Sequence, residues 1–381
     1  MRPESDDLKA SFELHRAEPG VSVDDHLRRK QIALAQSLDG RKIVYLDIWA
    51  WNRISDCILK GKSYPGVAAL HRQLVDGVGC GRLVCPVSEA IFLELMKQSD
   101  ARTRTATAEL IDALSEGVCL MAPDTRMNTE VAYFIHQSMT EKPLHELDHL
   151  VWTKTAYVLG VAHPLNERLP PDEQRVLQKA FVDHLWDLRL GDMVQTLDPP
   201  RWTFVDMNGL AQRLNQSNQA HQFELTNFRK VYADEVAGAA DLFAPLGCRV
   251  IADIFKKETG QEGRLQSAEK SDNEKMLRAI LTHALTMDKA RHILRSMHVH
   301  ATCHAAIRWD RQRKLSANDL FDFQHATAAL AYCDAFLCDR PMASLLTAKH
   351  TRLDQEMGCL VVSTPDALIH WFDELRRSPE S

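Results

Sequence analysis

Four acidic residues stand where a parallel sheet could bring them together. Asp47 follows the apolar run 43–46, and Asp339 follows the run 335–338. Glu94 and Asp322 lie in segments with helical patterns next to such runs. Strands of a parallel sheet end at one common edge, so Asp47 and Asp339 are predicted to share it. Converging carboxylates repel one another unless a cation neutralises them, and oxygen ligands suit Mg²⁺ or Mn²⁺. Such ions activate water for phosphodiester hydrolysis.

Each of these acids has a rival interpretation. Asp47 could simply cap the helix that follows it. Glu89 competes with Glu94, but five residues on a helix separate side chains by about 140°, so both cannot serve one ion. The spacing favours Glu94, and Glu89 suits the first helical turn. Asp319 ends an S-x-x-D sequence that resembles a capping box, yet it shares a helix face with Asp322 and could be an additional ligand.

Several polar and basic residues near the acids could contact a substrate. The segment before Asp322 is basic and could hold a phosphate backbone, although it could equally be a solvated helix end. His325 lies one helical turn beyond Asp322 on the same face, where it could contact the acid or a substrate, although a packed helix histidine is an equal alternative. The predicted substrate residues are Arg308, Arg311, Arg313, Arg340, Asn52 and His325.

The pattern of apolar residues predicts α/β alternation at both ends of the chain. Strands are expected at 43–46, 83–87, 118–121, 335–338 and 360–362, with helices at 23–37, 67–78, 90–96, 101–115, 320–332, 341–349 and 364–375. Strand–helix–strand–helix order is typical of a parallel sheet. Residues 126–304 show helical patterns without a strong strand signal, and their aromatic residues, including Phe223 and Trp202, are expected in a core. The hydrophilic stretch 258–273 resembles a linker.

These patterns give a domain prediction. Residues 1–40 form a polar arm and a helix, residues 41–125 form the first half of a sheet domain, and residues 305–381 form its second half. Residues 126–304 are a large, mainly helical insertion between the halves.

Composition limits the classes of function. The net charge is −6, so a nucleic-acid site must be a local basic patch rather than the whole surface. The acidic, polar start is unlike a signal or transit peptide, and no long uncharged apolar run predicts a membrane helix. Nine cysteines without a C-x-x-C pair are typical of a reducing compartment, so we expect a cytoplasmic protein.

The two ends of the chain resemble the PIN domain, the PilT N-terminus nuclease family. The resemblance covers residues 41–125 and 305–378 and rests on motifs around Asp47, Glu94, Asp322 and Asp339, with the closing segment 361–368. It implies a twisted parallel sheet flanked by helices, with these four acids binding Mg²⁺ or Mn²⁺ to cut RNA. The sequence differs from the family pattern at Trp49, where a small polar residue is usual, at Cys338, where Thr or Ser is usual, and in the length of the insertion.

The resemblance predicts a metal-dependent endoribonuclease with RNA as its substrate. A toxin of a toxin–antitoxin pair, a defence effector and an RNA-processing enzyme all fit, as do an inhibitory protein partner and self-association. Two alternatives remain open: a catalytically silent binding scaffold, and a nuclease specific for DNA structures.

Overall fold

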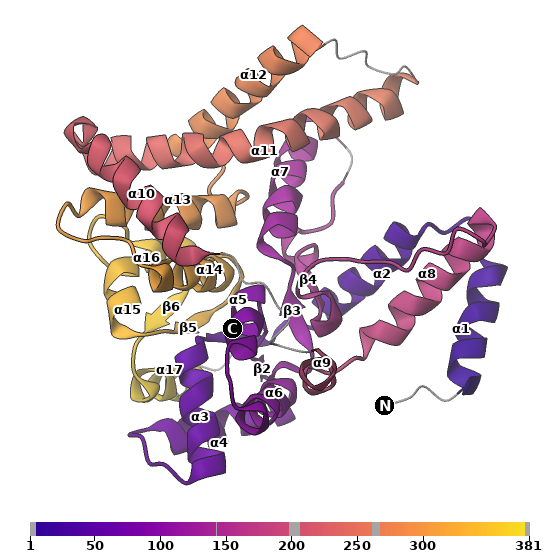
Figure 1. The fold of residues 1–381 in the computed structure, drawn as a ribbon, viewed down its shortest axis with the longest axis horizontal. Helices are drawn as coiled ribbons and strands as arrows, with labels where there is room; N and C mark the ends of the chain where they lie inside the picture. The colour runs from indigo at the N-terminus through magenta and orange to yellow at the C-terminus, as the bar shows by residue number, and fades with distance from the viewer. Residues whose placement is uncertain (1–4, 142, 198–205, 261–266, 378–381) are drawn as a thin grey trace. The chain divides into compact units, whose positions relative to one another are not determined.

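The computed structural model describes the chain except for residues 1–4, 142, 198–205, 261–266 and 378–381 (Figure 1). It is a mixed α/β protein with far more helix than strand. Its contacts divide it into two compact units: unit 1 holds residues 1–122, 148–202 and 364–381, and unit 2 holds residues 123–147 and 203–363. The predicted insertion, 126–304, is thus shared between both units. No helix among the described residues is long and apolar enough to cross a bilayer.

Unit 1 packs helices around short strands. Its elements are α1 (Ser5–Ala17), α2 (Val23–Gln36), β1 (Lys42–Leu46), α3 (Ile48–Lys60), α4 (Val67–Gly79), β2 (Leu83–Val84), α5 (Glu89–Met96), α6 (Ala101–Ser115), β3 (Val118–Leu120), β4 (Trp152–Lys154), α8 (Pro171–Trp186), α9 (Leu190–Thr196) and α17 (Pro365–Arg377), with the 3₁₀ turn η2 (Thr155–Tyr157). β1 and β2 are parallel, as the sequence predicts, with Lys42 opposite Leu83 and Ile43 opposite Val84.

The second predicted strand, 83–87, is shorter than expected because Pro86 interrupts it. Proline has no backbone N–H to donate to a ladder. The chain turns instead toward β3: the Cys85 N–H donates to the Leu114 carbonyl at 2.9 Å, and the Val87 N–H donates to the Val118 carbonyl at 3.0 Å. Ser88 then caps α5 by accepting from the Ile91 N–H.

Residues 126–304 are mainly helical, as predicted, but they contain the strand β4, which the sequence did not predict. β4 pairs antiparallel with β3, with Val118 opposite Lys154 and Leu120 opposite Trp152. The strand is only three residues long, too short for an alternating pattern to be seen in the sequence. Trp152 is buried there, as expected for a core aromatic residue.

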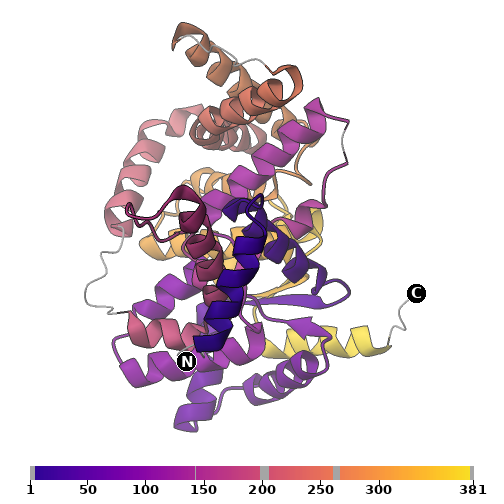
Figure 2. The same cartoon turned by 90° about the vertical axis from the view of Figure 1, so that its right-hand side faces the viewer.

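The predicted polar arm is also wrong over residues 5–17, because they form α1, which packs against α8 (Figure 2). Among residues 9–17, the part of the helix whose side chains the structure describes, His15 is the buried one. Asp183 of α8 holds it: the carboxylate accepts from Ser11 Oγ and His15 Nε2, both at 2.8 Å. The same carboxylate bonds to His26 Nε2 at 2.9 Å and pairs with Lys30 Nζ at 3.0 Å, both on α2. One acid therefore joins α1 and α2 to α8.

Substituting Asp183 by alanine is expected to release α1 and α2 from α8. Four donors lose their acceptor. Burial raises the pKa of the Asp183 carboxyl, but these donors outweigh burial and hold the pKa far below its usual range. Water does not replace the carboxylate at this packed surface. We expect a loss of about 2–4 kcal/mol in the free energy of unfolding. Hydrogen exchange followed by mass spectrometry should show faster exchange in residues 5–36, and Asp172→Ala, at an exposed site on the same helix, should show none.

Unit 2 is mainly helical. Its elements are α7 (Pro123–Met139), α10 (Met207–Ala220), the 3₁₀ turn η4 (Gln222–Glu224), α11 (Phe228–Thr259), α12 (Ser267–Thr286), α13 (Arg295–Trp309), α14 (Ala317–Tyr332), β5 (Ala335–Leu337), α15 (Arg340–Leu346), α16 (Leu353–Met357) and β6 (Leu360–Val362). Its core lies where α7, α11, α12 and α13 meet, and α12 packs along α11 (Figure 1). β5 and β6 are parallel, with Ala335 opposite Leu360 and Leu337 opposite Val362, as the sequence predicts.

Two predictions about unit 2 need correction, and two fall partly or wholly outside the described residues. Phe223 is 82% exposed instead of lying in the core, because it sits on η4, beyond the end of α10. The predicted helix 341–349 ends at Leu346 and is followed by α16, which the sequence did not reveal. In the predicted linker, α11 continues to Thr259 and α12 begins at Ser267, with 261–266 outside the described part. Trp202 lies outside it as well.

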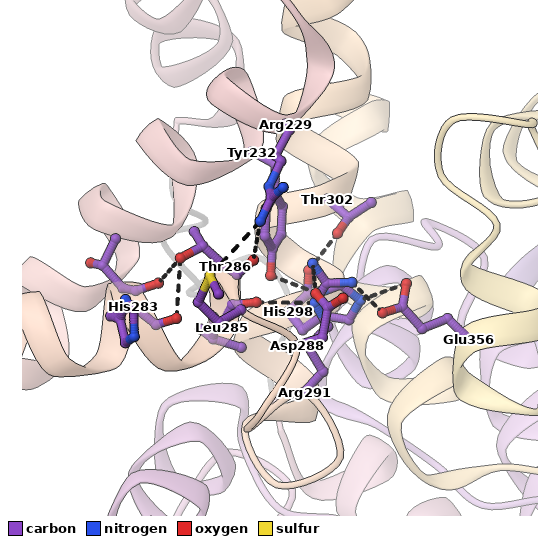
Figure 3. A network of polar contacts seen from close by, with 12 residues as sticks. Arg229, Tyr232, His283, Leu285, Thr286, Asp288, Arg291, His298, Thr302 and Glu356 are labelled. Carbon is purple, nitrogen blue, oxygen red and sulfur yellow. Dashed lines mark hydrogen bonds and ion pairs between the residues drawn. The ribbon is translucent and has the colours of Figure 1, made fainter.

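A polar network ties α16 to the helical core of unit 2 (Figure 3). His298 of α13 is 2% exposed; its Nδ1 bonds to Tyr232 Oη at 2.8 Å, and its Nε2 lies 3.4 Å from Glu356 Oε2. Arg291 donates to the Leu285 carbonyl at 3.0 Å and pairs with Asp288 and Glu356, each at 2.5 Å. Burial lowers the pKa of His298 more than Glu356 raises it, so the ring is neutral at neutral pH.

Unit 2 is expected to lose stability as the pH falls below about 6.5, the pKa of an unfolded histidine. Burial lowers the pKa of His300 to about 4 and that of His304 to about 3, and the two rings lie 4.5 Å apart, with His304 against Phe323. Their folded pKa values are depressed, so the unfolded state binds protons first; the stability is complete above pH 6.5 and declines toward the folded pKa values. Each ring should cost up to roughly 2 kcal/mol between pH 6.5 and 5.

Urea unfolding at pH 7.5 and pH 5 measures this effect. His300→Gln/His304→Gln should flatten the dependence, whereas His370→Gln, on an exposed helix face of unit 1, should leave it unchanged. An equal pH dependence in the double variant would contradict the assignment.

Candidate functional site

Asp47 lies at the end of β1, at the N-cap position of α3, and its side chain is only 5% exposed. Its carboxylate makes no capping hydrogen bond to α3. Capping of α3 by the side chain therefore does not explain why a carboxylate occupies this position. A buried carboxylate needs compensation by hydrogen-bond donors, by a positive side chain or by a bound cation.

Glu94, on α5, comes close to Asp47 within unit 1. Ligand oxygens of the two carboxylates lie within 4.8 Å of one another. Two local interactions fix this geometry: Ser88 caps α5, and its Oγ bonds to Tyr45 Oη of β1 at 2.5 Å. Tyr45 lies two residues before Asp47 on β1. The hydrogen bond between Tyr45 and Ser88 therefore fixes α5, which carries Glu94, against the strand that leads to Asp47. Glu89 occupies the first turn of α5.

The other predicted acids lie in unit 2, in different environments. Asp339 is the N-cap of α15, and its Oδ1 accepts from the Met342 N–H at 2.8 Å. Asp319 forms the predicted capping box: its Oδ2 accepts from the Ser316 N–H at 2.7 Å, and its Oδ1 pairs with Arg313. Both oxygens of Asp319 are thus engaged, which suits its structural role better than that of a ligand. Asp322 is half-buried on α14.

The predicted basic substrate residues differ in how far they are neutralised. Arg308 pairs with Glu235 at 3.0 Å, and Arg313 pairs with Asp319. Arg311 donates to the Leu225 carbonyl at 3.1 Å and keeps its charge uncompensated by any acid among the described residues. Arg340 is exposed at the first position of α15.

The two polar candidates are also placed differently. Asn52 is exposed on α3 and accepts from Gln98 Nε2 at 2.7 Å. His325 of α14 is fully buried, so its ring is not exposed to solvent as a substrate-contacting side chain would be.

An aromatic and cationic stack near Asp47 escaped the sequence analysis. The Arg53 guanidinium lies 4.5 Å from the centre of the Trp49 ring and 5.4 Å from that of Tyr64. Trp49 and Arg53 are four residues apart on the first turns of α3, a spacing that places them on one face and could have revealed the pair. Trp49 thus stacks against an arginine that lies six residues after Asp47, on α3.

A second cluster of potential ligands, His15, His26 and Asp183, lies in unit 1. The two histidine nitrogens lie at direct hydrogen-bond distance from the Asp183 carboxylate, and Lys30 forms an ion pair with the same carboxylate. The donors already satisfy Asp183, so the cluster acts as the structural tie described above.

Comparisons with protein-family models, with curated proteins and with solved structures return no match to this chain.

Proposed function

We propose that the chain is a divalent-metal-dependent nuclease that hydrolyses phosphodiester bonds, with RNA as its substrate. The observation that carries the proposal is the pair of carboxylates of Asp47 and Glu94, with oxygens within 4.8 Å and Asp47 almost fully buried. Two carboxylates this close repel one another, and a bound cation would offset that repulsion. The donors are all oxygen, which fits Mg²⁺ or Mn²⁺ better than softer ions.

In this proposal Asp47 and Glu94 hold the metal. For Asp322 and Asp339, a role in metal binding rests on their family-like motifs alone. A bound divalent ion would supply activation of water and charge stabilisation at the phosphate. Tyr45 and Ser88 act as positioning residues, because their hydrogen bond fixes α5 against β1.

The proposal is tested by titrating Mn²⁺ into the protein in a calorimeter and by following Mg²⁺-dependent cleavage of a single-stranded RNA. We expect saturable binding and cleavage that EDTA abolishes. Asp47→Asn should remove both while leaving the thermal melting temperature within a few degrees. Metal-dependent cleavage that persists in Asp47→Asn would refute the proposal. A matched DNA strand separates RNA from DNA specificity.

A catalytically silent scaffold is the second candidate. Two of the candidate acids, Asp319 and Asp339, accept capping hydrogen bonds, which is a sufficient structural reason for their presence. Absence of Mn²⁺ binding in a folded protein would favour this candidate over the nuclease. If the chain is a nuclease, we further propose a cytoplasmic toxin or defence role under the control of an inhibitory protein partner.

A further inference from the structure

Three cavities in unit 2 join into one groove along helices α10 to α13. The first, of about 620 Å³, lies between α10 and residues 307–317; the second, of about 560 Å³, and the third, of about 790 Å³, continue between α10, α11, α12 and α13. Asn218 and Arg308 line both the first and the second cavity, and Arg278 lines both the second and the third. We call this continuous surface the helical groove.

The helical groove is basic although the chain as a whole is acidic. Eight lysine and arginine side chains line it, against three acidic ones, in a chain of net charge −6. Some of these cations are neutralised by acids, as Arg308 is by Glu235 at 3.0 Å and Arg278 by Asp241 at 3.0 Å. Among the described residues, no acid pairs with Arg311 or Lys314. Cations concentrated in a groove attract a polyanion that runs along it.

One wall of the groove carries amide side chains that are not used by the fold. Gln212, Gln216 and Gln219 line the first cavity from one face of α10, are exposed, and make no hydrogen bond with any residue that the structure describes. Asn215, on the same face, is different: it bonds both ways to the backbone of Leu315, at 2.8 and 2.9 Å. Asn215 therefore fixes α10 beside the basic segment, while the three glutamines offer donors and acceptors to a ligand.

An exposed aromatic ring stands at the end of this wall. Phe223 is 82% exposed and follows Gln222, which lines the first cavity. Covering an exposed phenylalanine ring with an apolar or aromatic surface is favourable. Cations for phosphates, amides for base edges and an aromatic ring for stacking are together the means by which proteins bind unpaired nucleotides.

We propose that the helical groove binds a single-stranded nucleic acid, with Arg311 and Lys314 on its phosphates and Phe223 stacked on a base. The site lies outside the acid motifs, and α10, α11 and α12, which form most of its walls, lie in the segment that the family resemblance does not cover. It deepens the proposed nuclease function and rests on it only for its biological purpose, because strand binding needs neither metal nor catalysis.

The test is fluorescence anisotropy with a labelled RNA strand of roughly ten nucleotides, in EDTA, on full-length protein. Arg311→Ala/Lys314→Ala should weaken binding about tenfold and lower the slope of log K against log salt by about 1.4, since each phosphate contact on a single strand contributes about 0.7. Phe223→Ala should weaken binding roughly tenfold with no change in slope, because stacking is not ionic.

Lys257→Ala/Lys349→Ala is the matched control, since it removes the same charge from exposed positions outside the groove, and it should bind like the unaltered protein. Wild-type affinity in both groove variants, no strand binding by the unaltered protein, or equal losses in the control would each overturn the proposal. A duplex that binds equally well, or polyglutamate that displaces the strand equally well, would show a general polyanion site and overturn it too. Cleavage plays no part in this readout, so failure of the nuclease proposal is seen separately.

Discussion

Substitution of Glu94 by glutamine is expected to lower Mg²⁺-dependent RNA cleavage at least roughly a hundredfold, because loss of groups that merely orient a metal ligand already costs 10–100-fold. The amide keeps the shape of the side chain but loses the charge that compensates the ion. Asp47 would then hold the ion with one carboxylate fewer in unit 1. Initial rates at saturating Mg²⁺ measure the loss, and calorimetry should show weaker Mn²⁺ binding in the same variant.

Glu89→Gln is the matched control for this experiment. Glu89 is the first residue of α5, while Glu94 is the residue whose oxygen lies near Asp47. The control should keep its cleavage rate within a few-fold, and both variants should melt near the temperature of the unaltered protein. If Glu89→Gln loses cleavage and Glu94→Gln does not, the two acids exchange roles. If neither does, the metal site is not built on α5.

The sequence predicted well the elements whose signals are local. The S-x-x-D sequence that ends at Asp319 was predicted as a helix start, and it makes the capping-box hydrogen bonds with Ser316. The strand before Asp47 was clear because a buried run of β-branched and aromatic residues ends in a charge. These features depend on neighbours within four residues, which a single sequence contains.

Features that depend on distant residues were missed. α1 has a weak apolar face and depends on Asp183, more than 160 residues away in the chain. β4 is stabilised by pairing with β3 rather than by its own pattern. For the candidate site, position along the chain singled out Asp47 and Glu94 as candidate metal ligands. It could not show that the Asp47 side chain makes no capping hydrogen bond to α3, whereas the Asp339 side chain caps α15. The orientation of a carboxylate at a helix start is set by packing, and both outcomes fit the same sequence signal.

A second large effect is expected from Glu130, which organises the inside of unit 2. Its carboxylate is fully buried and accepts from the Ser296 N–H at 3.0 Å, from Ser296 Oγ at 2.6 Å and from Tyr332 Oη at 2.6 Å. Burial raises the pKa of Glu130, and these donors, with the nearby charge of Arg126, act against that rise. The acid thus satisfies an N-terminal N–H of α13 and joins α7, α13 and the end of α14.

Glu130→Ala should therefore destabilise unit 2 by about 3–5 kcal/mol, the usual cost of removing one partner from a buried charged group. The substitution leaves buried donors on Ser296 and Tyr332 without an acceptor, and a cavity in place of the side chain. Tyr332→Phe, which removes one donor and leaves the carboxylate in place, should cost only about 1–2 kcal/mol. Urea unfolding measures both, with Glu146→Ala, an exposed acid of the same unit, as the control. A loss below 1 kcal/mol in Glu130→Ala would mean that water replaces the carboxylate, and that α7 and α13 are held by their apolar contacts alone.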